Sequence, residues 1–199
     1  MHAEHFIKKI MYMTRLIVLD RDGVINEDSS DFVRSAEQWV PLPGAIDAIA
    51  RLNKAGWTVA IATNQSGLAR GHFDENDLAA MHDKMLTLVN DAGGRIAHIA
   101  YCPHGPDDRC QCRKPLPGLI YQIRDTLGLE TLTGAWMVGD SLRDLQAGQA
   151  AKCKLALVRT GKGRITEKDI NRLDNVSSIL IADSLADIVD KLLEMENIQ

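Results

Sequence analysis

The chain has 199 residues, 45% of them hydrophobic and 25% charged, so it can bury a sizeable core. Its net charge of −4, without any block of like charge, argues against nucleic acid or an anionic membrane as a partner. The longest apolar stretches are far shorter than the roughly 20 residues that span a bilayer. The amino end lacks the apolar segment and cleavage site of a signal peptide, so we expect a cytoplasmic protein.

Apolar runs typical of strands alternate with amphipathic stretches typical of helices along nearly the whole chain. This alternation predicts an α/β fold with a parallel sheet and helices on both faces. We expect residues 1–14 to be an N-terminal extension and residues 15–199 to form a single domain. The expected strands are 16–19, 57–62, 96–101, 135–138, 155–158 and 177–181, and the expected helices are 44–55, 75–91, 117–127 and 184–194.

Polar residues follow three of these strands at the point where each strand ends. Asp20 and Asp22 follow the first strand, Thr63 follows the second, and Asp140 follows strand 135–138. Ligands of open α/β sheets bind beyond the carboxyl ends of the strands. We therefore expect these side chains to share one site.

The residue types at these strand ends suit phosphoryl transfer. Gly23 lets the chain turn directly after Asp20 and Asp22, and the two carboxylates, with Asp140, could hold Mg²⁺. One carboxylate could attack phosphorus while the other donates a proton and later activates water. Thr63 and Lys114 are suitable donors to the phosphoryl oxygens. Each motif alone could be an ordinary surface turn, but the combination favours a magnesium-dependent phosphatase.

The order and spacing of these residues resemble the four motifs of the haloacid dehalogenase superfamily. The resemblance implies a Rossmann-like fold with little or no cap domain, and a phosphoric monoester hydrolase. It implies Asp20 as nucleophile and Asp22 as general acid and base. Thr63 and Lys114 would stabilise the phosphate, and Mg²⁺ would be held by Asp20, Asp22 and Asp140. Asp144, in the fourth motif, is either a support for this site or a solvated acid at a helix start.

A loop at residues 102–112 holds three of the four cysteines and has no apolar periodicity. Cys102, His104, Cys110 and Cys112 form a set of ligands typical of structural zinc, although the spacers are shorter than usual. A disulfide and free reduced thiols are the alternatives, and a cytosolic compartment argues against the disulfide. We favour structural Zn²⁺ in this loop.

Within the superfamily, the chain is similar to the D-glycero-D-manno-heptose 1,7-bisphosphate phosphatase family. The similarity runs from about Arg15 to about Lys162, and Ser141 departs from it because some members have lysine there. It implies a sugar bisphosphate substrate that loses its C7 phosphate, in the synthesis of ADP- or GDP-heptose precursors of lipopolysaccharide core or surface glycan. The implied substrate contacts are Asp28, Ser29, Ser30, Asp31, Asn64, Gln65, Ser66 and Arg113.

Two other functions remain open at this point. Histidinol-phosphate phosphatase, an enzyme of histidine biosynthesis, is the near relative that shares the zinc loop. A protein of another class would keep the fold as an inactive, zinc-stabilised phosphosugar-binding module. A polynucleotide substrate is disfavoured by the acidic net charge. We expect a monomer, because no exposed heptad or apolar edge favours assembly.

Overall fold

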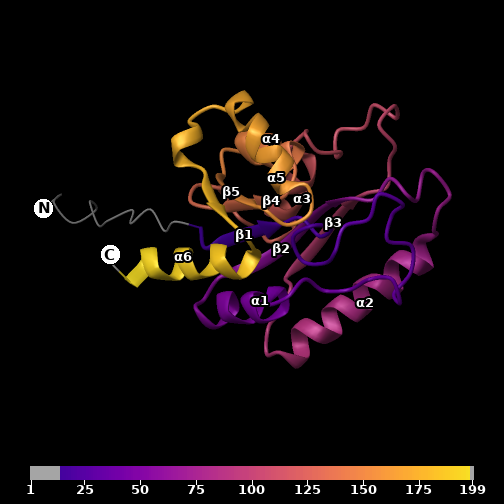
Figure 1. Ribbon diagram of the computed structural model, residues 1–199, viewed down its shortest axis with the longest axis horizontal. Coiled ribbons are helices and arrows are strands. Elements are labelled where there is room, and N and C mark those ends of the chain that lie inside the picture. The colour runs from indigo at the N-terminus through magenta and orange to yellow at the C-terminus, as the bar shows by residue number, and fades with distance from the viewer. Residues whose placement is uncertain (1–13, 198–199) are drawn as a thin grey trace, which may run out of the picture.

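The computed structural model describes residues 14–197, so the expected extension at residues 1–14 lies outside this range except for its last residue. A six-stranded sheet with the order β3-β2-β1-β4-β5-β6 forms the centre of the molecule (Figure 1). All neighbouring strands pair in parallel, which confirms the predicted sheet. The strands are β1 (Leu16–Leu19), β2 (Thr58–Asn64), β3 (His98–Cys102), β4 (Trp136–Gly139), β5 (Lys154–Val158) and β6 (Leu180–Ala182).

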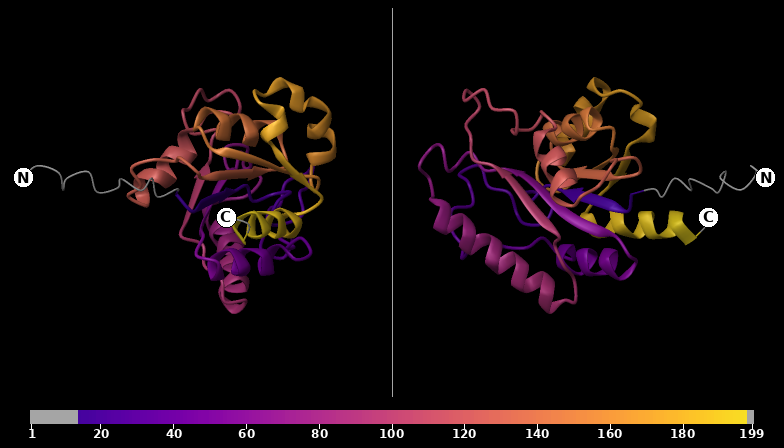
Figure 2. Two further views of the ribbon diagram at one scale, coloured as in Figure 1. Left: turned by 90° about the vertical axis from the view of Figure 1, so that its left-hand side faces the viewer. Right: turned by 180° about the vertical axis from the view of Figure 1, so that it is seen from behind.

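Helices cover both faces of the sheet, as the alternating pattern predicts (Figures 1 and 2). One face carries α1 (Ala45–Lys54), α2 (Glu75–Asp91) and α6 (Leu185–Asn197), and the other carries α3 (Gly118–Thr126) and α4 (Leu142–Ala150). A short α5 (Gly163–Thr166) and the 3-10 segments Glu167–Arg172 and Val176–Ser178 connect β5 to β6. The architecture is therefore Rossmann-like.

The core is divided by the sheet into two apolar layers. In β1, Ile17 and Leu19 pack in one layer, and Leu16 and Val18 pack in the other. This division follows from the strand geometry, in which successive side chains point to opposite faces. Because both faces are covered, all four residues are fully buried, and the strand is apolar without alternation.

The sequence pattern missed or misplaced a few elements. It did not predict α4, whose small and polar residues give only a weakly amphipathic pattern. The helix starts at a capping box in which Ser141 and Asp144 exchange hydrogen bonds, a local signal that was present in the sequence. β2 also runs two residues further than expected, because Thr63 and Asn64 continue the ladder with β3.

The strand order places a crevice at the centre of the sheet. From β1, the chain proceeds outward through β2 and β3, and then returns to the opposite side of β1 with β4. Such a reversal separates the connecting loops at the carboxyl ends of the two central strands and leaves room for a ligand. Among the helices of residues 14–197, none combines the length and apolar character needed to cross a membrane.

Candidate active site

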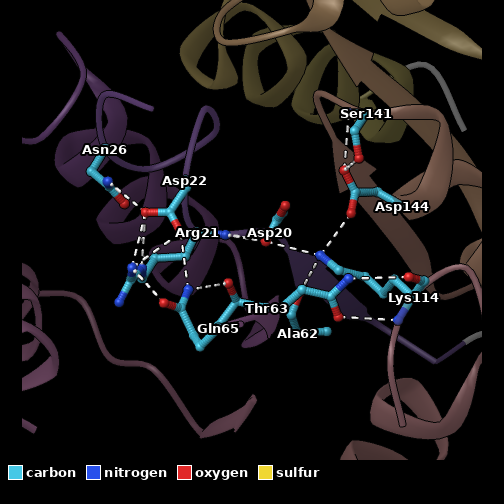
Figure 3. Close-up of polar contacts among 11 residues, drawn as sticks. Asp20, Arg21, Asp22, Asn26, Ala62, Thr63, Gln65, Lys114, Ser141 and Asp144 are labelled. Carbon is cyan, nitrogen blue, oxygen red and sulfur yellow. Dashed lines mark hydrogen bonds and ion pairs between the residues drawn. The ribbon is translucent and has the colours of Figure 1, made fainter. Parts of the chain in front are cut away.

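Asp20, directly after β1, faces the buried ammonium group of Lys114. The distance from Lys114 Nζ to Asp20 Oδ1 is 2.9 Å, and Nζ also lies 2.6 Å from Asp144 Oδ1. The same nitrogen donates to the carbonyl oxygen of Ala62 at 2.7 Å, so all three of its protons have acceptors (Figure 3). Lys114 is only 2% exposed, and this fixed cation lies beside the predicted nucleophile.

Asp140 follows β4 and lies against two glycines. A Cβ atom added to Gly23 or Gly161 would come within 2.3 Å or 2.2 Å of Asp140 Oδ2, so only glycine leaves room for this carboxylate. Both glycines also have a positive φ, which side chains disfavour. The main-chain N–H of Lys162 donates to Asp140 Oδ2 at 2.8 Å. The loop after β5 therefore helps to hold a carboxylate that follows β4.

Three carboxylates converge at this end of the sheet and suit a hard cation. Oxygen atoms of Asp20, Asp140 and Asp144 lie within 4.8 Å of one another. Burial, and then the charge of Asp144, raise the pKa of Asp20 to about 7 and that of Asp140 to about 8. Close, buried carboxylates of this kind are stabilised in their charged form by a divalent cation. The donor set therefore fits Mg²⁺, which prefers oxygen ligands.

Asp22 is turned away from these carboxylates and lies in a different network. Its side chain accepts from Asn26 Nδ2 at 2.9 Å, from Gln65 Nε2 at 2.9 Å and from Arg21 Nη2 at 3.0 Å (Figure 3). Burial works to raise the pKa of Asp22, but the Arg21 charge and these hydrogen bonds outweigh burial and hold the pKa below its usual value. The carboxylate of Asp22 is therefore not among the grouped metal-ligand oxygens.

Thr63, Asn64 and Gln65 at the end of β2 connect the two sides of the site. Gln65 donates to Thr63 Oγ1 at 2.8 Å, which leaves the Thr63 hydroxyl proton available to another acceptor. Asn64 exchanges two 3.1 Å hydrogen bonds with the main chain of Lys114. The amide of Asn64 thus holds Lys114, and its predicted contact with substrate remains a prediction.

Asp144, whose role the sequence left open, is 1% exposed and is not a solvated acid. Its Oδ2 accepts from the main-chain N–H of Ser141 at 2.9 Å and from the Ser141 hydroxyl at 2.6 Å. Burial works against ionisation of Asp144, yet Lys114 and these hydrogen bonds keep its pKa below the usual value. Ser141 therefore orients Asp144.

These residues line a cavity of about 330 Å³, and most of the residues that we predicted to contact the substrate line it too. Asp31 does not line it: this residue pairs with Arg34 and lines a neighbouring hollow. Asp28 lines the cavity and pairs with Lys162 at 2.5 Å. The predicted contacts that do line it are Asp28, Ser29, Ser30, Asn64, Gln65, Ser66 and Arg113, and the lining residues that the sequence did not indicate include Phe32, Arg70, Arg143 and Lys162.

The cluster at the zinc-loop positions forms one compact group. Cys102, His104, Cys110 and Cys112 place their ligand atoms within 4.8 Å of one another. The sulfur of Cys102 lies 3.2 Å from that of Cys112 and 3.7 Å from that of Cys110. Ligands around a tetrahedral Zn²⁺ with sulfur at about 2.3 Å stand roughly 3.8 Å apart. The side chains therefore fit such an ion with small adjustments. When no ion is bound, burial is the largest of the effects that raise the pKa of the Cys102 thiol to about 12.

Arg113 ties this cluster to the cavity. Its Nη1 donates to the carbonyl oxygen of His104 at 3.0 Å, which leaves its other N–H groups available. Partial burial, and then the charges of Arg143 and Arg70, lower the pKa of Arg113. Three arginines therefore lie near one another at this side of the cavity.

Known proteins are similar to this chain in both sequence and fold. The HAD-hydrolase-like family model matches residues 111–188. The D-glycero-beta-D-manno-heptose-1,7-bisphosphate 7-phosphatase of Pseudomonas aeruginosa is 51% identical over 180 residues, covering 90% of this chain and 98% of that relative.

Two solved structures extend the comparison. The D,D-heptose 1,7-bisphosphate phosphatase of Bordetella bronchiseptica, complexed with magnesium and phosphate, has 49% identity and a TM-score of 0.84, covering 90% of this chain and 98% of that one. The corresponding Burkholderia thailandensis enzyme has 39% identity and a TM-score of 0.67, covering 89% of this chain and 97% of that one. The chain therefore belongs to the haloacid dehalogenase-like (HAD) hydrolases, in the family of D-glycero-beta-D-manno-heptose-1,7-bisphosphate 7-phosphatases.

Proposed function

We propose that the protein is a magnesium-dependent phosphatase that removes the C7 phosphate of D-glycero-D-manno-heptose 1,7-bisphosphate through an aspartyl-phosphate. The observation that carries the proposal is the buried Asp20–Lys114 pair beside Asp140, in a cavity at the carboxyl ends of β1 and β4. Relatives with about half their residues identical carry this activity in their names. The near relative that acts on histidinol phosphate is not favoured by these similarities.

In the first half of the reaction, a carboxylate oxygen of Asp20 forms a bond to the phosphorus of the 7-phosphate. The bond between phosphorus and the sugar oxygen breaks, and the proton of Asp22 passes to that oxygen as it leaves. Lys114 favours the ionised form of Asp20, against the effect of burial, and neutralises charge on the phosphoryl oxygens. The Thr63 hydroxyl, which already accepts from Gln65, donates its proton to a phosphoryl oxygen.

In the second half, water attacks the phosphorus and gives its proton to Asp22, and the bond from phosphorus to Asp20 breaks. The products are inorganic phosphate and free Asp20. The lowered pKa of Asp22 keeps its carboxylate ionised and so able to accept this proton. To act as the acid in the first half, Asp22 must take up a proton and turn from Arg21 and Gln65 toward the leaving oxygen.

We assign the Mg²⁺ site to the carboxylates of Asp20 and Asp140. The ion would neutralise charge on the bound phosphate. Because the Asp22 side chain is engaged by Arg21, Asn26 and Gln65, a contribution from Asp22 would have to come from its main-chain oxygen. Asp144 is held by Lys114 and Ser141, and its role is to fix Lys114.

We assign structural Zn²⁺ to Cys102, His104, Cys110 and Cys112, a closed set that leaves no coordination position for water. The ion would hold the loop that leads into Arg113 and Lys114. Metal analysis of the purified protein should give about one equivalent of zinc per chain. Chelation should lower the melting temperature, whereas less than one equivalent together with unchanged stability would contradict the zinc site.

The remaining assignments extend the expectations from the sequence. We place the enzyme in the cytoplasm as a single-domain monomer that supplies heptose precursors of lipopolysaccharide core or surface glycan. The decisive experiment compares kcat/KM for both anomers of heptose 1,7-bisphosphate with kcat/KM for histidinol phosphate. A preference for histidinol phosphate would overturn the substrate, and no turnover of any phosphate ester with Mg²⁺ would favour an inactive binding protein.

A further inference from the structure

The loop after β5, residues 159–163, contacts the turn after β1, although β4 lies between these two strands. The Thr160 hydroxyl donates to the carbonyl oxygen of Gly23 at 2.6 Å. A Cβ atom added to Gly161 would come within 2.8 Å of the Gly23 Cα atom and 2.2 Å of Asp140 Oδ2. The two loops therefore meet beside Asp140, the residue that follows β4.

The main chain of the loop after β5 is fixed at both of its ends. Arg159 donates to Glu167 Oε2 at 2.7 Å and to Asp183 Oδ1 at 3.2 Å. A Cβ atom added to Gly163 would lie 1.7 Å from the carbonyl oxygen of Val158, so the chain turns tightly against the end of β5. The loop can therefore act as a support for other parts of the site.

Lys162, in this loop, contacts two parts of the site, one with its main chain and one with its side chain. Its main-chain N–H donates to Asp140 Oδ2 at 2.8 Å. Its Nζ lies 2.5 Å from Asp28 Oδ2, and both residues line the catalytic cavity. One residue thus joins a proposed metal ligand to residues 28–31, the predicted substrate contacts before α1, which we call the substrate loop.

The substrate loop has few other polar contacts. Asp28 Oδ1 accepts from the main-chain N–H of Ser29 at 2.9 Å, and Ser29 Oγ accepts from that of Asp31 at 3.1 Å. Arg34 pairs with Asp31. Within residues 14–197, every hydrogen bond or ion pair of the substrate loop has its partner among residues 28–34, apart from the pair with Lys162. Lys162 is therefore the polar link between this loop and the rest of the site.

On the basis of these contacts and of the proposed function, we propose that Lys162 is a positioning residue that holds the substrate loop against the sugar through Asp28. The main-chain N–H to Asp140 does not depend on the side chain, since every residue except proline has this donor. Replacing the side chain therefore releases the substrate loop and leaves the proposed metal site intact. A released loop weakens binding of the sugar more than it slows the reaction at Asp20.

The first test compares heptose 1,7-bisphosphate with 4-nitrophenyl phosphate, a phosphate ester without a sugar. For Lys162→Met, the ratio of kcat/KM for the bisphosphate to kcat/KM for the nitrophenyl ester should fall by about 3- to 10-fold, mainly through KM. The change is modest because the Lys162 side chain is 54% exposed and water screens the pair. Lys162→Arg should restore the ratio, and the exposed Lys168→Met, outside the cavity, should leave it unchanged.

Salt and Mg²⁺ separate the two contacts of Lys162. High salt should reduce the difference in this ratio between the wild type and Lys162→Met, because the side-chain contact is a partly exposed ion pair. The Mg²⁺ concentration for half-maximal activity should not change in Lys162→Met, because the N–H to Asp140 remains. A rise in that concentration would overturn the division between main chain and side chain.

Hydrogen–deuterium exchange examines the substrate loop without any substrate. Amide exchange in a peptide covering residues 27–33 should be faster in Lys162→Met than in the wild type, because a loop that has lost its link opens more often. Lys162→Arg and Lys168→Met should exchange as the wild type does. Unchanged exchange in Lys162→Met would overturn the proposal.

A double variant distinguishes this indirect role from a direct contact between Lys162 and the substrate. If Lys162 acts through Asp28, Asp28→Asn combined with Lys162→Met should lower the ratio no more than Asp28→Asn alone. Losses that add in full would overturn the proposal. If the wild type hydrolyses the nitrophenyl ester but not the bisphosphate, the proposed function fails, whereas the exchange experiment still decides whether Lys162 holds the loop.

Discussion

Asp20 and Asp22 come from the same turn after β1, yet their surroundings differ in charge. Burial is the largest influence on both carboxyl groups and works to raise both pKa values. For Asp20 the charge of Asp144 adds to burial, and the pKa rises to about 7. For Asp22 the neighbours are the donors Arg21, Asn26 and Gln65, and the pKa falls. Two identical side chains two residues apart can therefore take different roles in one reaction.

Replacing the nucleophile should have the largest effect. We expect Asp20→Asn to reduce kcat roughly a million-fold, the scale seen when a hydrolase loses its nucleophile, while the protein stays folded. Steady-state hydrolysis of heptose 1,7-bisphosphate measures the loss, and thermal denaturation checks the fold. The exposed Asp83→Asn on α2 is the matched control and should keep full activity. Activity of Asp20→Asn near that of the control would remove Asp20 as nucleophile.

Replacing Asp22, the general acid and base, should have a smaller effect. We expect Asp22→Asn to lower kcat by about 100- to 10,000-fold. In this variant the rate of the first half-reaction with 4-nitrophenyl phosphate should change little, because nitrophenolate is a good leaving group that needs no proton. This variant should therefore release a stoichiometric burst of nitrophenol and then turn over slowly. Stopped-flow absorbance measures both phases. Equal losses for the sugar and nitrophenyl substrates in the first phase would contradict the role of Asp22 as an acid.

The network around Asp22 can be weakened without touching either acid. Gln65→Leu removes hydrogen bonds to Asp22 and Thr63 and leaves their buried atoms short of partners. We expect the free energy of unfolding to fall by about 1–3 kcal/mol. Urea denaturation measures the change. The exposed Gln122→Leu on α3 should stay within about 0.5 kcal/mol of the wild type, and a similar loss in both variants would mean that the network contributes nothing specific.

The smallest expected effect concerns the titration of His82, which is partly buried on α2. Burial, and then the Arg21 charge, lower the pKa of His82 to about 4 from 6.5. Below pH 6.5 the unfolded chain takes up a proton at His82 that the folded protein does not bind until about pH 4. Stability present above pH 6.5 is therefore lost as the pH falls toward 4.

As the pH falls from about 7.5 to about 5.5, the titration of His82 should lower the free energy of unfolding by about 1 kcal/mol. His82→Phe should reduce the loss by that amount, as measured by urea denaturation at several pH values. An identical pH dependence in the two proteins would show that the pKa of His82 is not lowered in the folded protein. Replacement of the exposed His72, which lies between β2 and α2, is the control and should leave the pH dependence unchanged.

Much of the fold could be read from local patterns. β1 is the expected segment without change, and α2 matches its predicted bounds, because Asp74 and Asp77 form a capping box at its start. α4 was missed because its residues make a weak helical pattern, although Ser141 and Asp144 supply a start signal. β6 is shorter than expected, since Val176–Ser178 forms a 3-10 turn before it.

The site was predictable to the extent that it depends on strand ends. Asp20, Thr63 and Asp140 come together because parallel strands present their carboxyl ends at one edge. Arg70 and Arg143 gave no comparable signal. Each is an exposed arginine in a loop or helix turn, and only the folding of distant segments brings them to one cavity.

The sequence by itself determined which residues stand at the ends of the central strands, because the run of apolar residues and the turn after it are local properties. Only the tertiary structure decided that Asp22 faces Gln65 and that Lys114 joins Asp20 to Asp144. It also decided that Arg143 lines the same cavity as Arg113. Side-chain direction and pKa depend on neighbours from other segments of the chain, and these neighbours are set by packing.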